Sequence, residues 1–282
     1  MYPRAFAYVR PRSTEEAVAQ LAEHGDGANV LAGGMSLVPM LKYRQRAPGV
    51  LVDIGRLTDL AGVDATGDTV EIGATTRHAD VAALASGAGV TPMLAELAGR
   101  IGDVQVRNMG TVGGGLAAVE PTGDWGAALL ALRGEVVAVA SGGERRIAAD
   151  DLFVATYTTS LRPDELLTRV LLPQGGRLGA AQAKFERRTA AGVLSCVAAV
   201  CLGDGDDVIE AGVGCIGLEG HPVRLTEVED VLRGQPFGSE LVAAAAAAVG
   251  ADDFRRSVLG SLVRDALERA GAQASAGTGA KR

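Results

Sequence analysis

The chain has 282 residues, of which 48% are hydrophobic and 22% are charged, and its formal net charge is -7. This length suits one large or two ordinary domains, and the apolar fraction is enough for a substantial core. The acidic balance argues against a broad nucleic-acid-binding surface, so an anionic ligand would have to be held by local backbone geometry.

Alternating helices and strands are expected in the first part of the chain. Residues 13–17, Ser-Thr-Glu-Glu-Ala, look like a capped helix start, followed by apolar residues at helical spacing. Period-two alternation and short apolar runs predict the strands, and longer apolar segments predict the helices. The expected strands are 29–32, 50–54, 70–74 and 135–140, and the expected helices are 79–86, 93–101 and 125–132.

The pattern changes after residues 174–176, Gln-Gly-Gly, which form a candidate domain joint. The later strands are expected at 181–185, 194–202 and 208–216, and the later helices at 226–232, 240–249 and 254–270. The tail at 274–282 is small and polar and is expected to be disordered. Mixed elements followed by strands and then helices predict an α+β protein with two units.

Three cysteines, Cys196, Cys201 and Cys215, lie in apolar, strand-like runs with no Cys-x-x-Cys spacing. An iron–sulfur cluster normally takes four closely spaced cysteines, so we expect buried thiols with neither a cluster nor a disulfide framework. We see no apolar signal-peptide core at the start and no run of roughly 20 apolar residues that would span a membrane. These features predict a cytoplasmic protein without a membrane span.

Two glycine-rich loops are the candidate ligand site. Gly33-Gly34 directly follows an expected strand, and the second loop runs from Gly110 to Gly115. Glycine permits positive φ and has no Cβ, so backbone N–H groups can converge on phosphate oxygens even in an acidic protein. Neither loop is a G-x-G-x-x-G or P-loop motif, and each alone could be a tight turn. Together they predict a ligand with a pyrophosphate, which two loops can hold from both sides.

Several motifs occur in order along nearly the whole chain. Residues 32–39 resemble an AGGxSLxP loop, and residues 108–115, with Pro121 and Asp124 beyond, resemble an N-x-G-[TS]-[IV]-G-G-N…P…D element. Further matches are the opening at 6–17, a DEL-T…P strand at 164–173, Lys184 with Arg188, and the segment 221–234. In this order they resemble the FAD-binding medium subunit of molybdenum hydroxylases, the family that includes xanthine dehydrogenase and aerobic carbon monoxide dehydrogenase.

The resemblance implies an α+β fold with a two-part FAD-binding domain of the PCMH type at 1–175, whose lobes are about 1–57 and 58–175. A smaller α+β C-terminal domain, with the disordered tail, is expected at 176–282. In the family both glycine loops hold the FAD pyrophosphate. By position, Asp124 would lie near the adenosine end, Leu167 would pack on the flavin or adenine, and Lys184 would lie near the isoalloxazine. The expected FAD contacts are Leu31, Ala32, Gly33, Gly34, Met35, Ser36, Leu37, Thr111, Val112, Gly113, Gly114, Gly115, Asp124, Leu167 and Lys184.

The chain departs from the family pattern in two stretches. Gly115 replaces an asparagine, so one side-chain hydrogen bond should be missing, and residues 190–193 lack the usual acidic and aromatic residues at the flavin edge. His78 is a candidate either for a place beside the cofactor or for a simple helix start. Trp125 is expected in the core rather than as a stacking platform. Arg187 and Arg188 could pair with partner carboxylates or be solvated.

Electron transfer is the implied function, and no catalytic residue or metal site is expected on this chain. Electrons from a large molybdopterin subunit would cross iron–sulfur clusters on a small subunit, reach FAD here, and leave to an external acceptor. A dimer of heterotrimers is the expected assembly. Two alternatives remain open at this point. One is a self-contained FAD-dependent oxidoreductase, and the other is a non-catalytic nucleotide-binding or assembly module.

Overall fold

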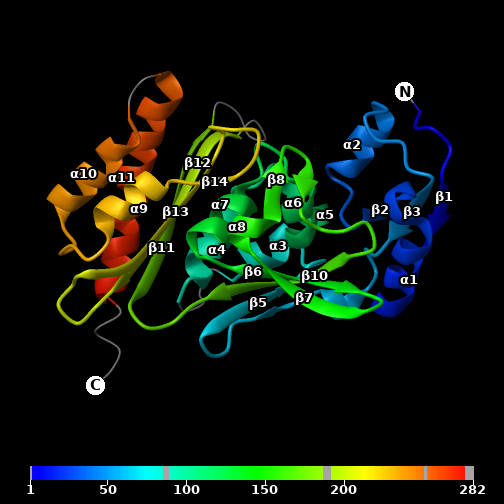
Figure 1. The fold of residues 1–282 in the computed structure, drawn as a ribbon, viewed down its shortest axis with the longest axis horizontal. Helices are drawn as coiled ribbons and strands as arrows, with labels where there is room; N and C mark the ends of the chain where they lie inside the picture. Colours follow the sequence, from blue (N-terminus) through cyan, green and yellow to red (C-terminus); the bar gives the residue numbers. More distant parts are fainter. Residues whose placement is uncertain (1, 85–88, 187–191, 251–252, 277–282) are drawn as a thin grey trace.

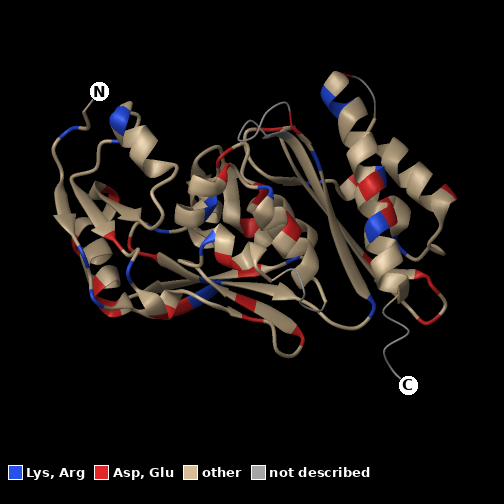
Figure 2. Ribbon diagram, turned by 180° about the vertical axis from the view of Figure 1, so that it is seen from behind, with Lys and Arg blue, Asp and Glu red and all other residues tan. Residues whose placement is uncertain are grey.

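The computed structural model describes residues 2–84, 89–186, 192–250 and 253–276. Its elements form three layers of structure along the long axis, and the two chain termini lie at opposite ends of it (Figure 1). Basic and acidic residues are interspersed on the N-terminal sheet, the central part and the C-terminal helices alike (Figure 2). Within the described ranges, no helix is long and apolar enough to cross a membrane.

A small parallel sheet opens the fold. Its strands have the order β1-β3-β2, and the Ser13 side chain accepts the Glu16 N–H to begin the helix that packs beside them. Apolar residues of that helix and of β3 form their own small core. The elements here are β1 (Ala7–Val9), α1 (Thr14–His24), η1 (Gly25–Gly27), β2 (Ala28–Leu31), α2 (Leu37–Lys42), β3 (Val50–Asp53) and η2 (Thr58–Leu60).

The middle of the chain builds an antiparallel sheet in the order β4-β5-β10-β6-β7, and its helices pack into one large core with the sheet. Its strands are β4 (Val63–Asp64), β5 (Thr69–Gly73), β6 (Glu135–Ala140), β7 (Gly143–Ala148) and β10 (Leu166–Pro173). Its helices are α3 (His78–Ala82), α4 (Thr91–Gly99), α5 (Val104–Met109), α6 (Val112–Ala118), α7 (Asp124–Ala131) and α8 (Ala149–Leu152). A separate ribbon pairs β8 (Phe153–Ala155) with β9 (Thr158–Thr159).

The last part is an antiparallel sheet, β11-β12-β13-β14, with three helices on one face. Its strands are β11 (Leu178–Glu186), β12 (Gly192–Leu202), β13 (Val208–Ile216) and β14 (Val223–Arg224). Its helices are α9 (Thr226–Leu232), α10 (Ser239–Ala248) and α11 (Phe254–Ala276). Figure 1 shows α9, α10 and α11 on the side of this sheet that faces away from α4 and α7.

Both faces of the C-terminal sheet are buried, which explains why β12 reads as a continuous apolar run. Val197 and Ala199 point into the core of the middle part, whereas Cys196 and Ala198 point into the core under the C-terminal helices. Because successive strand residues face opposite sides, one strand serves two cores. The two parts therefore share a packed interface.

Three local predictions were wrong. Residues 110–115 do not form a loop, because Val112–Ala118 is a helix capped by the Thr111 side chain, which accepts the Gly114 N–H. The predicted elements also omitted α2 and α5. The tail was expected from residue 274, yet α11 continues to Ala276, with Ala274 only 1% exposed against β11. Residues 277–282 lie outside the described ranges.

Candidate functional site

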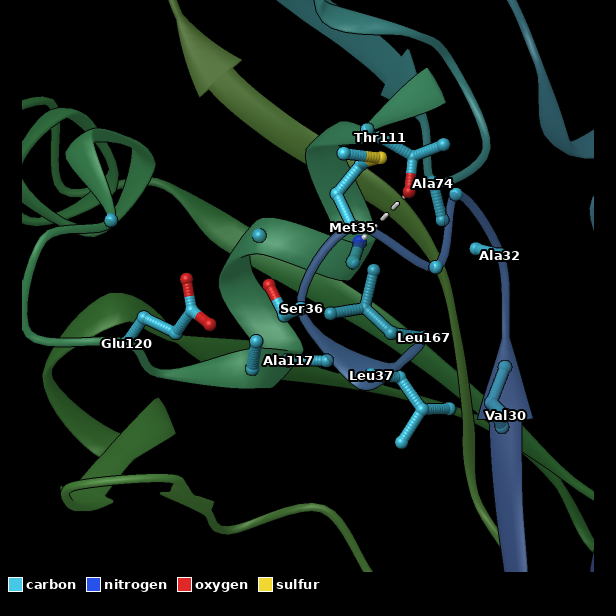
Figure 3. Close-up of a pocket in the computed structure, with 18 of the residues that line it drawn as sticks. Val30, Ala32, Met35, Ser36, Leu37, Ala74, Thr111, Ala117, Glu120 and Leu167 are labelled. Atoms are coloured by element: carbon cyan, nitrogen blue, oxygen red, sulfur yellow. Dashed lines mark hydrogen bonds between the residues drawn. The ribbon is translucent and has the colours of Figure 1, made fainter. Parts of the chain in front are cut away.

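A cavity of about 550 Å³ lies between the N-terminal sheet and the helices of the middle part. Of the 15 residues expected to contact the ligand, 13 line it. The exceptions are Leu31, which packs beneath Gly34, and Val112, which is fully buried in the core. Figure 3 shows the loop that carries Met35, Ser36 and Leu37 passing close to the helix that begins at Thr111. The cavity lies within the usual volume range of a small-molecule site.

The first glycine loop, residues 32–36, leaves its backbone donors unused. Among the described residues, the four N–H groups from Gly33 to Ser36 donate to no protein acceptor. Gly34 has a φ of +72°, a conformation that glycine adopts without steric cost. Unspent N–H groups beside a cavity can bind anionic oxygens. This loop fits the pyrophosphate-binding role that the sequence suggested.

The second glycine segment, residues 110–115, has a different task. The Val112 N–H donates to the Thr76 carbonyl at 3.0 Å, and the Gly113 N–H donates to the Ala74 carbonyl at 2.9 Å, the dashed line in Figure 3. The hydrogen bonds of these two amides therefore hold the start of α6 against the residues that follow β5. Since glycines 113–115 have no positive φ, the expected nest of convergent N–H groups is not formed here. This segment contributes a close-fitting wall.

Direct backbone contact joins the two glycine segments. A Cβ atom at Gly33 would overlap the Met109 carbonyl oxygen and lie 2.8 Å from the Gly110 Cα. A Cβ at Gly113 would lie 2.6 Å from the Ala74 Cβ. Real Cβ atoms do not approach other atoms so closely, so glycine is needed for packing as much as for conformation. The missing side chains set the width of the cavity at this point.

A buried ion pair lies at another part of the cavity wall. Lys184 Nζ donates to Asp124 Oδ2 at 2.7 Å and to the Arg100 carbonyl at 3.2 Å, and the two side chains are only 4% and 2% exposed. Gln182 Nε2 donates to the other Asp124 oxygen at 3.0 Å. Burial raises the pKa of the Asp124 carboxyl above its ordinary value, while the charge of Lys184 opposes that rise.

This pair corrects one expectation. The family resemblance implies Asp124 at the adenosine end of the ligand and Lys184 beside the isoalloxazine, but two groups in direct contact cannot serve opposite ends of an extended dinucleotide. They form a single charged feature in the cavity wall. The two residues are 60 positions apart in sequence, and β11 brings Lys184 to the first turn of α7.

Apolar side chains form another wall. Leu167 lies on β10 just before a register shift and is 5% exposed, and Figure 3 shows it beside Leu37 and facing the first glycine loop. Leu37 begins α2, whose start is displaced from the sheet by that loop. Branched aliphatic groups in this position suit a flat aromatic ring system, since they offer apolar contact without a competing hydrogen bond.

The role of His78 was open and Trp125 was expected in the core, and both residues line the cavity. Trp125 Nε1 donates to His78 Nδ1 at 3.1 Å, and the side chains are 3% and 5% exposed. Burial lowers the pKa of His78 to about 4. Trp125 is in the core as expected, and His78 is both the first residue of α3 and a part of the wall. No sequence signal pairs two residues 47 positions apart.

Other lining residues were missed, among them Arg46, Glu120 and Tyr157. Arg46 Nη2 donates to the Tyr157 carbonyl at 3.3 Å, which ties the loop after α2 to the β8–β9 ribbon. Figure 3 shows the Glu120 carboxylate on the side of the cavity near Ser36. The sequence feature that could have indicated Arg46 is the basic run at 42–46, which ends at this residue.

The described ranges contain no group of three or more His, Cys, Asp or Glu side chains that could hold a metal ion. Cys196 and Cys215 are neighbours across β12 and β13, and burial raises the pKa of both thiols. Arg187, Arg188 and the stretch 190–191 of the expected flavin edge lie outside the described residues.

The donor set and shape of the cavity fit FAD. Four N–H groups without a protein acceptor could bind an anion, aliphatic side chains could pack on a ring system, and Lys184 supplies a buried cation. A cation of this kind stabilises a reduced, anionic flavin. The missing Cβ atoms at Gly33 and Gly113 let the first glycine loop and the start of α6 pack directly on Met109 and Ala74, which keeps both segments close together at the cavity wall.

Comparison with known proteins agrees with this chemistry. Residues 4–175 match the family "FAD binding domain in molybdopterin dehydrogenase", and residues 180–270 match "CO dehydrogenase flavoprotein C-terminal domain". The chain is 35% identical to 6-hydroxypseudooxynicotine dehydrogenase complex subunit alpha of Paenarthrobacter nicotinovorans over 96% of each chain. It is 34% identical to the carbon monoxide dehydrogenase medium chain of Hydrogenophaga pseudoflava, covering 97% of this chain and 99% of that one.

Solved structures give the same result. Carbon monoxide dehydrogenase from Hydrogenophaga pseudoflava superposes with a TM-score of 0.88 at 34% identity, over 97% of this chain and 99% of that one. Quinoline 2-oxidoreductase from Pseudomonas putida 86 gives a TM-score of 0.82 at 26% identity, over 98% and 99%. The α+β fold with a flavoprotein C-terminal domain is thereby confirmed. The chain belongs to the family of FAD-binding medium subunits of molybdenum hydroxylases.

Proposed function

We propose that this chain carries FAD as the electron-transfer subunit of a molybdopterin-dependent hydroxylase or dehydrogenase. The observation that carries the proposal is the combination of unspent N–H groups at residues 33–36 with the buried Lys184–Asp124 pair in one cavity. When bound, the flavin can take electrons singly and release them as a pair. The chain itself binds and positions the cofactor, and it needs no general acid or base for the oxidation of a substrate.

The placement of FAD follows from the walls of the cavity. The N–H groups of the first glycine loop bind the pyrophosphate, with the Ser36 hydroxyl as a further donor. Leu167 and the Lys184–Asp124 pair would hold the isoalloxazine, where the cation would offset negative charge on a reduced ring. Thr111 and glycines 113–115 form the opposite wall and control the space beside the phosphates.

Medium subunits of this family work in multi-subunit complexes with a large and a small subunit. We propose that the large one holds the molybdopterin, that the small one holds the iron–sulfur clusters, and that two such heterotrimers associate in the cytoplasm. Two-fold symmetry is the commonest closed arrangement of oligomers. The division of this chain at residue 175 remains a prediction, supported by the glycine pair Gly175-Gly176, both of which have positive φ.

Flavin content and electron flow test the proposal. The purified or reconstituted chain should show flavin absorption bands and release FAD, not FMN, on denaturation. Co-expressed with a molybdopterin subunit and a cysteine-rich subunit from the same operon, it should co-elute with both on size-exclusion chromatography. The oxidisable substrate should reduce its flavin only in that complex. Reduction of the isolated chain by a small organic substrate would favour the self-contained oxidoreductase instead, and failure to bind micromolar FAD would favour an assembly module.

A further inference from the structure

His78 is a buried side chain with one nitrogen in use and one nitrogen at the cavity. Its ring lies against the second glycine segment, because a Cβ atom at Gly110 would come within 2.8 Å of Nε2 and one at Gly115 would lie 4.0 Å from Cε1. The side chain is 5% exposed and lines the cavity. It is thus part of the wall that faces the cofactor.

Trp125 fixes the tautomer of this histidine. The indole nitrogen can only donate, and it donates to His78 Nδ1, so Nδ1 must be the unprotonated, accepting nitrogen. Burial keeps the ring neutral, with a pKa of about 4, and the packed neighbours Gly110, Gly115 and Trp125 carry no charge. A neutral imidazole has a single proton. That proton must therefore be on Nε2.

The Nε2–H group has no acceptor among the described residues, although its atom is not sealed inside the protein. The side chain is nine-tenths buried, and its one donor without a protein partner belongs to a residue of the cavity wall. A ligand that excludes water from the cavity without offering an acceptor would leave this donor unsatisfied, at a cost in free energy. An acceptor on a bound ligand would remove that cost. The donor is therefore arranged for a ligand rather than for the protein.

The position along the cavity identifies the part of the ligand. His78 lies between the glycine segments and Asp124, whose neighbour in the chain is Trp125. On the proposed placement of FAD, this is the stretch between the pyrophosphate and the isoalloxazine. We propose that His78 Nε2–H donates a hydrogen bond to an oxygen atom of the ribityl chain or the isoalloxazine of FAD, and that Trp125 is a positioning residue that holds the tautomer. The inference rests on the proposed function and adds a specific contact to it.

Two substitutions separate hydrogen bonding from packing. His78→Phe keeps a planar ring but removes the donor, whereas His78→Gln keeps an N–H donor near the Nε2 position. In the full chain stripped of flavin, titration with FAD should give a dissociation constant about tenfold higher for His78→Phe, equivalent to about 1.4 kcal/mol. The glutamine variant should stay within about threefold of the wild type. His221→Phe, which changes a histidine away from the cavity, should bind FAD as the wild type does.

Competition by ADP locates the contact. ADP carries the adenosine and pyrophosphate but not the ribityl chain or the ring, so His78→Phe should leave ADP affinity unchanged within about twofold. Equal loss of FAD and ADP affinity, or wild-type FAD affinity in His78→Phe, would overturn the inference. Absence of FAD binding by the wild-type chain would overturn the proposed function instead, so the two failures are distinguishable.

A spectroscopic measurement covers the case in which His78→Phe does not fold. Nitrogen-15 NMR of the wild-type chain labelled at histidine should report a neutral Nε2–H tautomer for His78. Addition of FAD should shift the Nε2 and its proton, and addition of ADP should shift them far less. In Trp125→Phe the tautomer should become mixed before FAD is added. A His78 signal that is indifferent to FAD would contradict the proposed contact.

Discussion

At the scale of single residues, the candidate site is decided by buried polar groups whose partners lie far away in sequence. Lys184 and Asp124 are both almost fully buried, and the charge of each one offsets the cost of burying the charge of the other. A buried pair of this kind adds little net stability compared with apolar side chains, yet removing one member leaves an uncompensated charge. The pair is better explained as a feature retained for the cofactor than as a source of stability.

Lys184→Met should lower the free energy of unfolding by about 3 kcal/mol at neutral pH, because it leaves the Asp124 carboxylate buried without its cation. The deficit should shrink at lower pH, since burial already raises the pKa of Asp124 and its protonated form needs no cation. The double variant Lys184→Met, Asp124→Asn should recover most of the lost stability. Chemical denaturation of the flavin-free chains measures all three. If the unfolding midpoint of Lys184→Met equals that of the wild type, the Asp124 carboxylate does not depend on Lys184 for its burial.

His78 should make folding pH-dependent. Its pKa of about 4 in the folded chain is below the ordinary value of 6.5, so its contribution is complete above about pH 6.5 and is lost as the pH falls toward 4, where the unfolded chain binds the extra proton. Between pH 7.5 and 5 this contribution falls by about 2 kcal/mol. Denaturation of wild type and His78→Gln at several pH values should show the difference between them changing by that amount. A constant difference would contradict a buried neutral imidazole.

At the scale of elements, the cavity depends on how closely two glycine segments approach each other. Gly33 packs on the carbonyl of Met109, at the last residue of α5, and Gly113 packs on Ala74 just beyond β5. The first segment is a true loop with unspent donors, and the second is a helix start whose amides are engaged. The first segment therefore keeps its backbone N–H groups available for a ligand, and the second segment provides a rigid wall.

Gly33→Ala should impair FAD retention strongly. The added methyl group would overlap the Met109 carbonyl, so the loop must move away from α5, and the four N–H groups would leave their place in the cavity. Overpacking of this kind costs about 1–3 kcal/mol, which a domain of this size should survive. Gly27→Ala is the matched control, because a Cβ there meets nothing within 4 Å and the position has no positive φ. Equal flavin content in both purified variants would mean that the loop position does not matter.

At the scale of the whole molecule, the FAD-binding part and the C-terminal part are held together by close backbone contact. Cβ atoms at Gly212 and Gly214 of β13 would overlap the Ala131 and Ala127 carbonyls of α7. On the far face of the same sheet, a Cβ at Gly179 would overlap the Ala270 carbonyl of α11. The helix that begins with Asp124 is thus fixed against the sheet that carries Lys184, which keeps the ion pair in register.

Glu229 should contribute strongly to the free energy of unfolding through its contacts across this interface. Its carboxylate is 1% exposed and accepts from Arg224, from the Val213 N–H at 2.9 Å and from Arg133 Nη2 at 3.4 Å. Glu229→Ala should therefore lower the free energy of unfolding by about 3–5 kcal/mol, because it leaves buried donors without an acceptor. Glu210→Ala is the control, since Glu210 also pairs with Arg133 but is 58% exposed, and its loss should cost less than about 1 kcal/mol. If the two variants lose similar free energies of unfolding in urea, the distinction between the buried and the exposed carboxylate is wrong.

The sequence by itself determined many of the longer elements and the chemistry of one loop. The capped start of α1, the limits of β6 and α9, and the buried strands β12 and β13 follow from patterns within a dozen residues, which depend on local backbone preference and on alternation. Only the tertiary structure decided that Asp124 and Lys184 contact each other in the cavity wall, that residues 112–118 form a helix, and that Trp125 fixes the tautomer of His78. Each of these depends on groups brought together by packing of distant elements. A glycine run is compatible with a loop or a helix start until its amides find carbonyl partners such as Ala74 and Thr76.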